Sequence, residues 1–369
     1  MELAQIFRAI EETQFLKKLS SQPKLFFVGD SAPVEYIRSF FSNYPAASNN
    51  RYFDLSINSL EELGKLTDIH SYQAIVVVSL EDETALFDAI NQQLDSSAHP
   101  VVLKLFADIF INLLCDRPPL QPIPPQNSQP QTSYAILTTP RSGSTYLCDL
   151  LDSTAIAGHP AEHLRLATQE LARHCNFNYL QLLDNLLEYR TTNNGVFGTK
   201  LISHFLFELM QTKPDFKYIF QAIDKFILLI RQDKVAQAVS LVLAQKTEVW
   251  HLHHNPQQKV KQSNYQSKLA SIEIDDALLN DVEQKVVFIE KQERRLKNIL
   301  ANNKIDPLVI VYEDILDNAP EQINRILDFL QIAPSEQNVR QITSGVKRMP
   351  STISQQIIQQ YRTRASAVH

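Results

Sequence analysis

One short stretch carries the residue types of an anion-binding turn. An apolar run at 134–137, typical of a buried strand, leads into 146–151, whose apolar spacing predicts a helix. A helix N-terminus has unpaired backbone N–H groups and the positive end of the macrodipole, so it binds anions, most often phosphates. A helix cap with an incidental arginine is the simpler alternative. The candidate anion ligands are Arg141, Ser142, Gly143, Ser144 and Thr145.

A second strand and helix carry another cation. Residues 226–230 form a continuous apolar run that predicts a buried strand, and 234–248 predict a long helix. Ligands of open α/β sheets bind outside the carboxyl ends of the strands, which is where Arg231 stands. Ser240 lies well inside the predicted helix, on the side of Gln237. The arginine is therefore placed to meet an anion.

Candidates for proton transfer follow the first turn. Glu162 ends an irregular stretch where a helix is predicted to begin. It could act as general base towards an attacking hydroxyl, or simply complement the positive end of the helix. His159 and His163 are further candidate bases. Lys200, near the end of a predicted strand at 196–201, could neutralise charge on a transferring group or simply be a surface lysine.

Three segments together resemble the bacterial carbohydrate sulfotransferases of the trehalose sulfotransferase type. The turn TPRSGST at 139–145 lacks the leading glycine and the Gly-Lys pair of an NTPase phosphate loop. It resembles instead the 5′-phosphosulfate loop of sulfotransferases, with arginine where eukaryotic cytosolic enzymes commonly have lysine. Residues 158–162 match the family's G-x-P-x-E segment, and DKVAQAVS at 233–240 is similar to its 3′-phosphate segment.

The resemblance, which covers about residues 133–369, implies a reaction and assigns residues to it. The donor would be 3′-phosphoadenosine 5′-phosphosulfate (PAPS), the acceptor a hydroxyl of a carbohydrate or glycolipid, and no metal would be needed. His159 stands where the family often has an acidic residue involved in sugar binding. The implied catalytic residues are Glu162 as base, Arg141 and Lys200; the donor-binding residues are Arg141, Ser142, Gly143, Ser144, Thr145, Arg231, Ser240 and, in the C-terminal segment, Arg348; the acceptor-binding residues are His159 and His163.

Composition limits the partners. A formal net charge of -6 argues against nucleic acid as the main partner. Three scattered cysteines give neither a disulfide framework nor a zinc spacing, and the histidines at 251, 253 and 254 lack further ligands at metal spacing. The N-terminus does not resemble a signal peptide, and no apolar run is long enough to span a bilayer. We therefore expect a cytoplasmic protein that is not integral to a membrane, with the oligomeric state open, a homodimer included.

The fold class predicted for the whole chain is α/β. Strands at 24–28, 74–79 and 101–106 with helices between them predict a small α/β domain of unknown role at 1–116. Further helices are expected at 2–19 and 109–114. The proline- and glutamine-rich stretch 117–131 predicts a linker. Residues 132–369 should then form the sulfotransferase domain, a P-loop-like three-layer parallel sheet of the sulfotransferase type.

Within that domain a mobile, irregular loop is expected at 251–275, a long helix at 276–302 and a last strand at 308–313. Tyr312 and Glu313 at the end of that strand are expected to be structural residues. Two rival functions remain at this stage. One is a P-loop enzyme that transfers phosphoryl groups, and the other is a non-catalytic nucleotide-binding or interaction protein.

Overall fold

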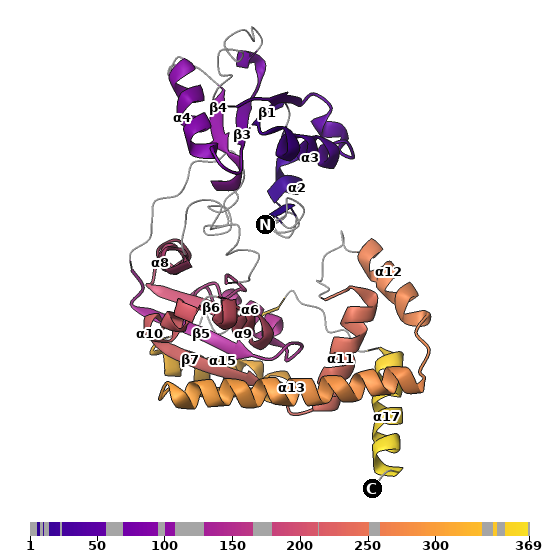
Figure 1. Cartoon of the computed structure of the whole chain (residues 1–369). Coiled ribbons are helices and arrows are strands. Elements are labelled where there is room, and N and C mark those ends of the chain that lie inside the picture. Colours follow the sequence, from indigo (N-terminus) through magenta and orange to yellow (C-terminus); the bar gives the residue numbers. More distant parts are fainter. Residues whose placement is uncertain are drawn as a thin grey trace. The chain divides into compact units, whose positions relative to one another are not determined.

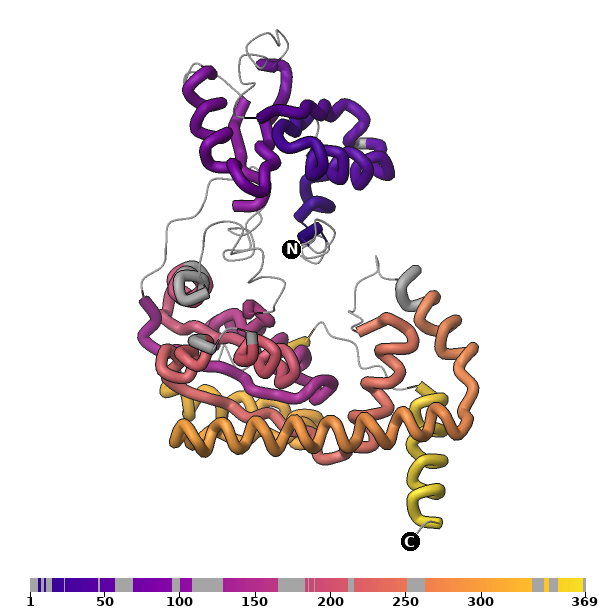
Figure 2. The backbone as a smooth tube through the Cα atoms, viewed as in Figure 1, coloured from indigo at the N-terminus to yellow at the C-terminus, as the bar shows by residue number. Residues whose placement is uncertain are grey.

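The computed structural model describes most of the chain, which divides into two compact units (Figures 1 and 2). One unit comprises Met1–Gln126 and His163–Tyr189, and the other comprises Asn127–Glu162 and Arg190–His369. The described residues are 6–7, 10, 15–22, 24–56, 69–94, 100–107, 129–164, 179–212, 214–250, 259–333, 342–344 and 351–367.

The first unit contains a parallel sheet with the strand order β2-β1-β3-β4. The predicted strands β1 (Leu25–Gly29), β3 (Ala74–Val78) and β4 (Val101–Lys104) are confirmed, except that β4 ends at Lys104 and not at Phe106, because residues 105–107 are helical. Edge strand β2 (Arg51–Asp54) was not predicted from the sequence, because this short, half-exposed segment with charged ends lacks the apolar run of a buried strand. The helices of this unit are α2 (Phe15–Leu19), α3 (Ser31–Phe41), α4 (Glu83–Gln93) and α8 (Tyr179–Arg190).

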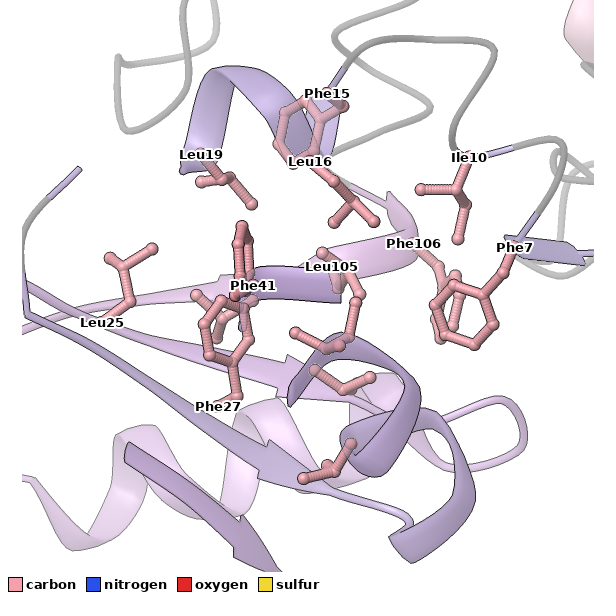
Figure 3. Packing of buried hydrophobic residues seen from close by; sticks show 14 of the residues in the cluster. Phe7, Ile10, Phe15, Leu16, Leu19, Leu25, Phe27, Phe41, Leu105 and Phe106 are labelled. Atoms are coloured by element: carbon pink, nitrogen blue, oxygen red, sulfur yellow. The ribbon is translucent and has the colours of Figure 1, made fainter. Parts of the chain in front are cut away.

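Alternating side chains of β1 and β3 bury both faces of this sheet. Leu25 and Phe27 face a cluster that includes α2 and α3 (Figure 3), whereas Phe26 and Val28 face a second cluster with α4. Phe7 and Ile10, the inner part of the helix predicted at 2–19, are also buried in the first cluster. The helix predicted at 109–114 lies outside the described residues. Burying each large apolar side chain stabilises the unit by roughly 1.5–3 kcal/mol.

The second unit contains a parallel sheet with the order β6-β5-β7-β8. Its strands are β5 (Thr132–Thr138), β6 (Val196–Ile202), β7 (Lys225–Ile230) and β8 (Leu308–Val311), all paired in parallel. The chain leaves β5 for β6 on one side and then returns to β7 on the other side of β5. The carboxyl ends of β5 and β7 therefore flank the point where strand order reverses, which is where ligands bind in such sheets.

Helices cover both faces of this sheet, so the predicted three-layer α/β architecture is confirmed. Helices α6 (Ser144–Ser153) and α15 (Ala319–Leu330) share one apolar cluster with Tyr134, Ile136 and Ile227 of the strands. Successive residues of a strand point to opposite faces, and α9 (Ser203–Thr212) and α13 (Asp276–Asn302) pack on β6 and β5 and on each other.

Beyond the sheet, α13 extends towards three further helices (Figure 1). These are α11 (Lys234–Thr247), α12 (Lys259–Ala270) and α17 (Thr352–Ala367), which share an apolar cluster with α13. The two short helices are α10 (Ile219–Ala222) and α14 (Tyr312–Asp317). Among the described residues no helix is both long and apolar enough to cross a membrane.

The structure corrects two predictions for this unit. The stretch 251–275 is not irregular throughout, because 259–270 forms α12, while 251–258 lies outside the described residues. The last strand ends at Val311 rather than at Glu313, and Tyr312 already begins α14. The helix predicted at 276–302 is confirmed at both ends. Asp275 caps its N-terminus by accepting from the N–H of Leu278 at 2.8 Å.

Glycine at position 198 makes room for a buried tyrosine of the neighbouring strand. Tyr134 is fully buried and its hydroxyl donates to the carbonyl of Ala157 at 2.7 Å, so its ring position is fixed. A Cβ at Gly198 would lie 2.6 Å from Cζ of Tyr134. The side chain of Tyr134 thus connects strand β5 to the segment that follows α6.

Replacing Gly198 with alanine should lower the free energy of unfolding by about 1–3 kcal/mol, because the new methyl group overpacks the Tyr134 ring. Urea denaturation followed by fluorescence of the single tryptophan, Trp250, measures this in the same unit. In a Tyr134→Leu background the same change should cost clearly less. Equal costs in the two backgrounds would contradict the assignment.

Candidate active site

The turn after β5 has the strained backbone expected of an anion-binding loop. Arg141 and Gly143 both have left-handed φ values, 62° and 90°. A Cβ at Gly143 would lie 2.1 Å from Cδ2 of Tyr312, so only glycine fits there. Thr138 anchors the turn, since its hydroxyl donates to the carbonyl of Leu229 on β7 at 3.1 Å and also pairs with the hydroxyl of Ser142. The first turn of α6 follows at once, with its backbone N–H groups at the carboxyl edge of the sheet.

The side chain of Arg141 joins this turn to helix α11. Its Nε donates to Oγ of Ser240 at 3.0 Å, and its Nη1 donates to the carbonyl of Trp250. Burial lowers the pKa of Arg141; nearby Tyr265 opposes that shift and Arg231 adds to it. An arginine remains charged through such a shift. The structure therefore brings together Arg141 and Ser240, to which the sequence assigned two different phosphate groups of the donor.

Arg231 stands at the carboxyl end of β7, as predicted, and faces the same turn. Its Nη1 donates to the carbonyl of Arg141 at 3.4 Å. Its guanidinium lies over the ring of Tyr312, 5.0 Å from the centroid, which is a cation–π contact. Two arginines thus converge on one edge of the sheet, an arrangement that favours an anionic ligand.

The segment between β7 and α11 is fixed by carboxylates. Glu313 on α14 accepts from the backbone N–H groups of Gln232 and Asp233 at 3.0 and 3.1 Å. Asp233 in turn caps α11 by accepting from the N–H of Ala236 at 2.9 Å. Its second oxygen accepts from Arg362 of α17 at 2.8 Å. These contacts fix the backbone that carries Arg231 relative to α11.

Glu162 and Lys200 form an ion pair beside the start of α6. Nζ of Lys200 lies 2.9 Å from Oε1 of Glu162 and 3.3 Å from Oγ1 of Thr145. Lys200 is 5% exposed and Glu162 is 22% exposed, so the carboxylate is the more accessible partner. The pair stands next to the helix N-terminus at which the predicted anion would bind.

A short parallel bridge brings Glu162 to this place. Ala161 bridges to Thr199 of β6, and the N–H of Lys200 donates to the carbonyl of Ala161 at 2.9 Å. The prediction that Glu162 lies in the first turn of a helix is wrong, because residues 162–164 are not helical. Gly158, with φ 74°, lets the segment pass close to the backbone of β6.

The sequence also predicted His159, His163 and Arg348 as site residues. His159 pairs through Nδ1 with Asp152 near the end of α6. Asp152 lies seven residues beyond Thr145, which corresponds to about 10 Å of helix rise. His163 is buried and belongs to the first unit, and Arg348 lies outside the described residues.

Sequence reasoning missed two contributors to the loop's surroundings. Gln237 of α11 is fully buried and donates from Nε2 to Oγ1 of Thr139 at 2.8 Å and to the carbonyl of Pro140 at 2.7 Å. A glutamine flanked by apolar residues on a buried helix was the available signal. Tyr312 was expected to be only structural, yet its ring covers Gly143 and Arg231. No group of three or more histidine, cysteine or acidic side chains suited to a metal occurs among the described residues.

The family match agrees with this site. The Stf0 sulphotransferase family matches residues 133–364, and the chain belongs to that family. The chain is therefore a sulfotransferase, an enzyme that transfers a sulfonate group. The resemblance inferred from the three segments is confirmed.

Two trehalose 2-sulfotransferases are among the similar proteins. The one from Mycolicibacterium smegmatis is 23% identical over 54% of this chain and 84% of its own length. The one from Mycobacterium tuberculosis is 27% identical over 56% of this chain and 89% of its own length. Both alignments span slightly more than half of the present chain.

Two solved structures show only a weak likeness. A mouse sulfotransferase complexed with PAP has a TM-score of 0.33 and 16% identity, covering 64% of this chain and 69% of that one. The sulfotransferase domain of the Synechococcus PCC 7002 olefin synthase has a TM-score of 0.30 and 14% identity, covering 65% and 97%. TM-scores this low establish neither a shared fold nor a shared function.

Replacing Glu313 with alanine should cost about 1.5–3 kcal/mol of stability, because two backbone N–H groups lose a charged acceptor. The same variant should bind an anionic nucleotide less tightly, since Arg231 is carried by the released segment. Urea denaturation and nucleotide titration measure the two effects. The matched control is Asp314→Ala on the same helix, an exposed carboxylate whose loss should change neither quantity.

Proposed function

We propose that the second unit binds PAPS and transfers its sulfonate to a hydroxyl group of a carbohydrate or glycolipid. The observation that carries this proposal is the Glu162–Lys200 pair, which is 2.9 Å apart and stands beside Thr145 at the N-terminus of α6. A carboxylate, an ammonium group and free helix N–H groups there provide a base, a cation and an anion site. Membership of the sulphotransferase family and the similarity to trehalose 2-sulfotransferases support it.

The donor would lie across the carboxyl ends of β5 and β7. Backbone N–H groups at the start of α6 and the hydroxyls of Ser144 and Thr145 would hold the 5′-phosphosulfate. Arg231 and Ser240 would hold the 3′-phosphate. Arg141 would contact both phosphate groups, a proposal supported by the hydrogen bond from its Nε to Oγ of Ser240. Ser142, whose side chain is buried against Thr138, would contribute through its backbone.

The chemistry follows from these positions. Glu162 would take the proton of the acceptor hydroxyl as its oxygen attacks sulfur in line with the bridging oxygen. The new sulfur–oxygen bond forms while the bond to the bridging oxygen breaks, and adenosine 3′,5′-bisphosphate leaves with the bonding electrons. Lys200 and Arg141 would stabilise the negative charge that develops on that oxygen. Lys200 also keeps the carboxylate of Glu162 in place through their ion pair.

The assignments outside this centre belong to the same proposal. The catalytic domain would be 132–369, preceded by a separate domain at 1–116 and a linker at 117–131, in a cytoplasmic enzyme. His159 and His163 remain candidates for acceptor binding. Because His159 pairs with Asp152 at the far end of α6, it would meet a part of the acceptor remote from the reacting hydroxyl.

The donor is tested by thermal unfolding with adenosine 3′,5′-bisphosphate, ADP, or ATP plus magnesium. At a hundred times its dissociation constant the bisphosphate should add roughly 2.7 kcal/mol of stability. Arg231→Ala should weaken its binding by roughly 1.5–3 kcal/mol, whereas Arg294→Ala, a change at an exposed arginine of α13, should not. Equal stabilisation by ATP with magnesium, unchanged in Arg231→Ala, would favour the phosphoryl-transfer alternative.

The base is tested with Glu162→Gln, which keeps the shape of the side chain and removes its proton affinity. We expect kcat for sulfonate transfer, assayed with trehalose and other disaccharides as acceptors, to fall by roughly 10²–10⁴. Binding of the bisphosphate should persist. Glu290→Gln on the surface of α13 is the control. Full turnover in Glu162→Gln would remove the base assignment.

A further inference from the structure

A buried amide links the two segments that the proposed donor would bridge. Gln237 is 0% exposed on α11, one helical turn before Ser240. Its Nε2 reaches across to the turn after β5, lying 2.8 Å from Oγ1 of Thr139 and 2.7 Å from the carbonyl of Pro140. Both acceptors immediately precede Arg141. Gln237 therefore contacts one side-chain hydroxyl and one backbone carbonyl of the loop.

The position of these bonds matters because the loop backbone is strained. A residue other than glycine with left-handed φ costs of the order of 1 kcal/mol and persists only where the surroundings hold it. Arg141 has φ 62°, and this angle is measured from the peptide plane that contains the Pro140 carbonyl. An amide that fixes this carbonyl fixes the plane, and with it the direction in which the following N–H groups point.

The rest of the loop has no comparable support from α11. Thr138 ties the turn to β7 and to Ser142, on the strand side of Pro140. Arg141 and Ser240 also join the loop to α11, but through side chains that the donor itself would engage. Gln237 is the link that can remain unchanged whether the donor is bound or absent.

We propose that Gln237 is a positioning residue, which holds the Pro140–Arg141 peptide in the orientation required for recognition of the 5′-phosphosulfate by the loop. The inference rests on the proposed donor, and it assigns to Gln237 an effect on the 5′ end of the nucleotide but not on its 3′-phosphate. Its chemistry requires a donor group. The amide nitrogen provides two N–H groups, which match the two oxygens, whereas a glutamate carboxylate could accept from the Thr139 hydroxyl but would face the Pro140 carbonyl with no proton.

The loop itself can be examined without any nucleotide. Hydrogen exchange measured by mass spectrometry on peptides spanning 138–146 should be about tenfold faster in Gln237→Met than in the wild type, because two hydrogen bonds that fix the loop are lost. Gln322→Met is the matched control, a buried glutamine on α15 whose contact is with Arg325 of its own helix. Unchanged exchange in Gln237→Met, or equal acceleration in both variants, would overturn the proposal.

Two nucleotides distinguish an effect at the 5′ end of the donor from an effect at its 3′ end. Adenosine 3′-monophosphate has the 3′-phosphate alone, and adenosine 3′,5′-bisphosphate adds the 5′-phosphate that the loop would bind. In Gln237→Met the gain in affinity from the 5′-phosphate should shrink about tenfold, while the affinity for the 3′-monophosphate should change little. The kcat of Gln237→Met should fall together with this gain in affinity. An equal loss for both nucleotides would mean general damage to the site and would contradict a role confined to the loop.

Gln237→Glu provides a readout that a purely structural role would not give. At about pH 8 the carboxylate repels the carbonyl of Pro140, whereas its protonated form at lower pH again supplies one O–H donor to that carbonyl. Affinity for the bisphosphate relative to the wild type should therefore recover as the pH is lowered. No recovery would count against hydrogen-bond donation as the cause. Failure of the proposed donor would be seen separately, as a wild-type enzyme that does not prefer the bisphosphate to ADP.

Discussion

The site depends on holding a strained, cation-bearing turn against a helix. The turn after β5 contains a left-handed arginine, and the guanidinium groups of Arg141 and Arg231 converge near it. Like charges and strained backbone are both unfavourable without support. Neutral hydrogen-bond donors and acceptors hold the turn, and carboxylates behind it hold the neighbouring backbone. The ring of Tyr312 contacts Arg231 and excludes any side chain at position 143. The second unit thereby holds two guanidinium groups close together, and an anionic ligand would neutralise their charge.

Charge is distributed in layers around α11. Arg141 and Arg231 lie at the site predicted for the nucleotide. Asp233 and Glu313 accept hydrogen bonds from the backbone that follows Arg231. Asp233 links the N-terminus of α11 to Arg362 of α17, and Lys234 is held by Glu293, which also pairs with Lys297 at 2.7 Å. Although burial acts to raise it, the pKa of Glu293 is lowered by these two lysines. Helices α13 and α17 therefore stabilise the segment on which Arg231 and Ser240 stand, although they contribute none of the predicted donor ligands.

The first unit has its own parallel sheet and core. It contains one buried acid of note, Glu83, which accepts from the N–H groups of Phe106 and Ala107 at 2.7 and 3.2 Å. Burial raises the pKa of this carboxyl group to about 7, against the opposing effect of those two bonds. The carboxyl ends of β1 and β3 are joined by Asp30, which accepts from the N–H of Leu80 at 3.0 Å. Asp30 thus has a structural partner.

The sequence by itself determined the strands with continuous apolar runs, helices α11 and α13, and the family. Continuous apolar runs identify β5 and β7, because strands buried on both faces leave no room for polar residues, and short motifs identify the residues at their carboxyl ends. Only the tertiary structure decided that Glu162 follows a bridge to β6 instead of opening a helix, that it pairs with Lys200, that His159 pairs with Asp152, and that Gln237 and Tyr312 shape the loop. Each of these depends on contacts between residues distant in the chain. Local propensity and spacing carry no information about such contacts until the strands are paired in their final order.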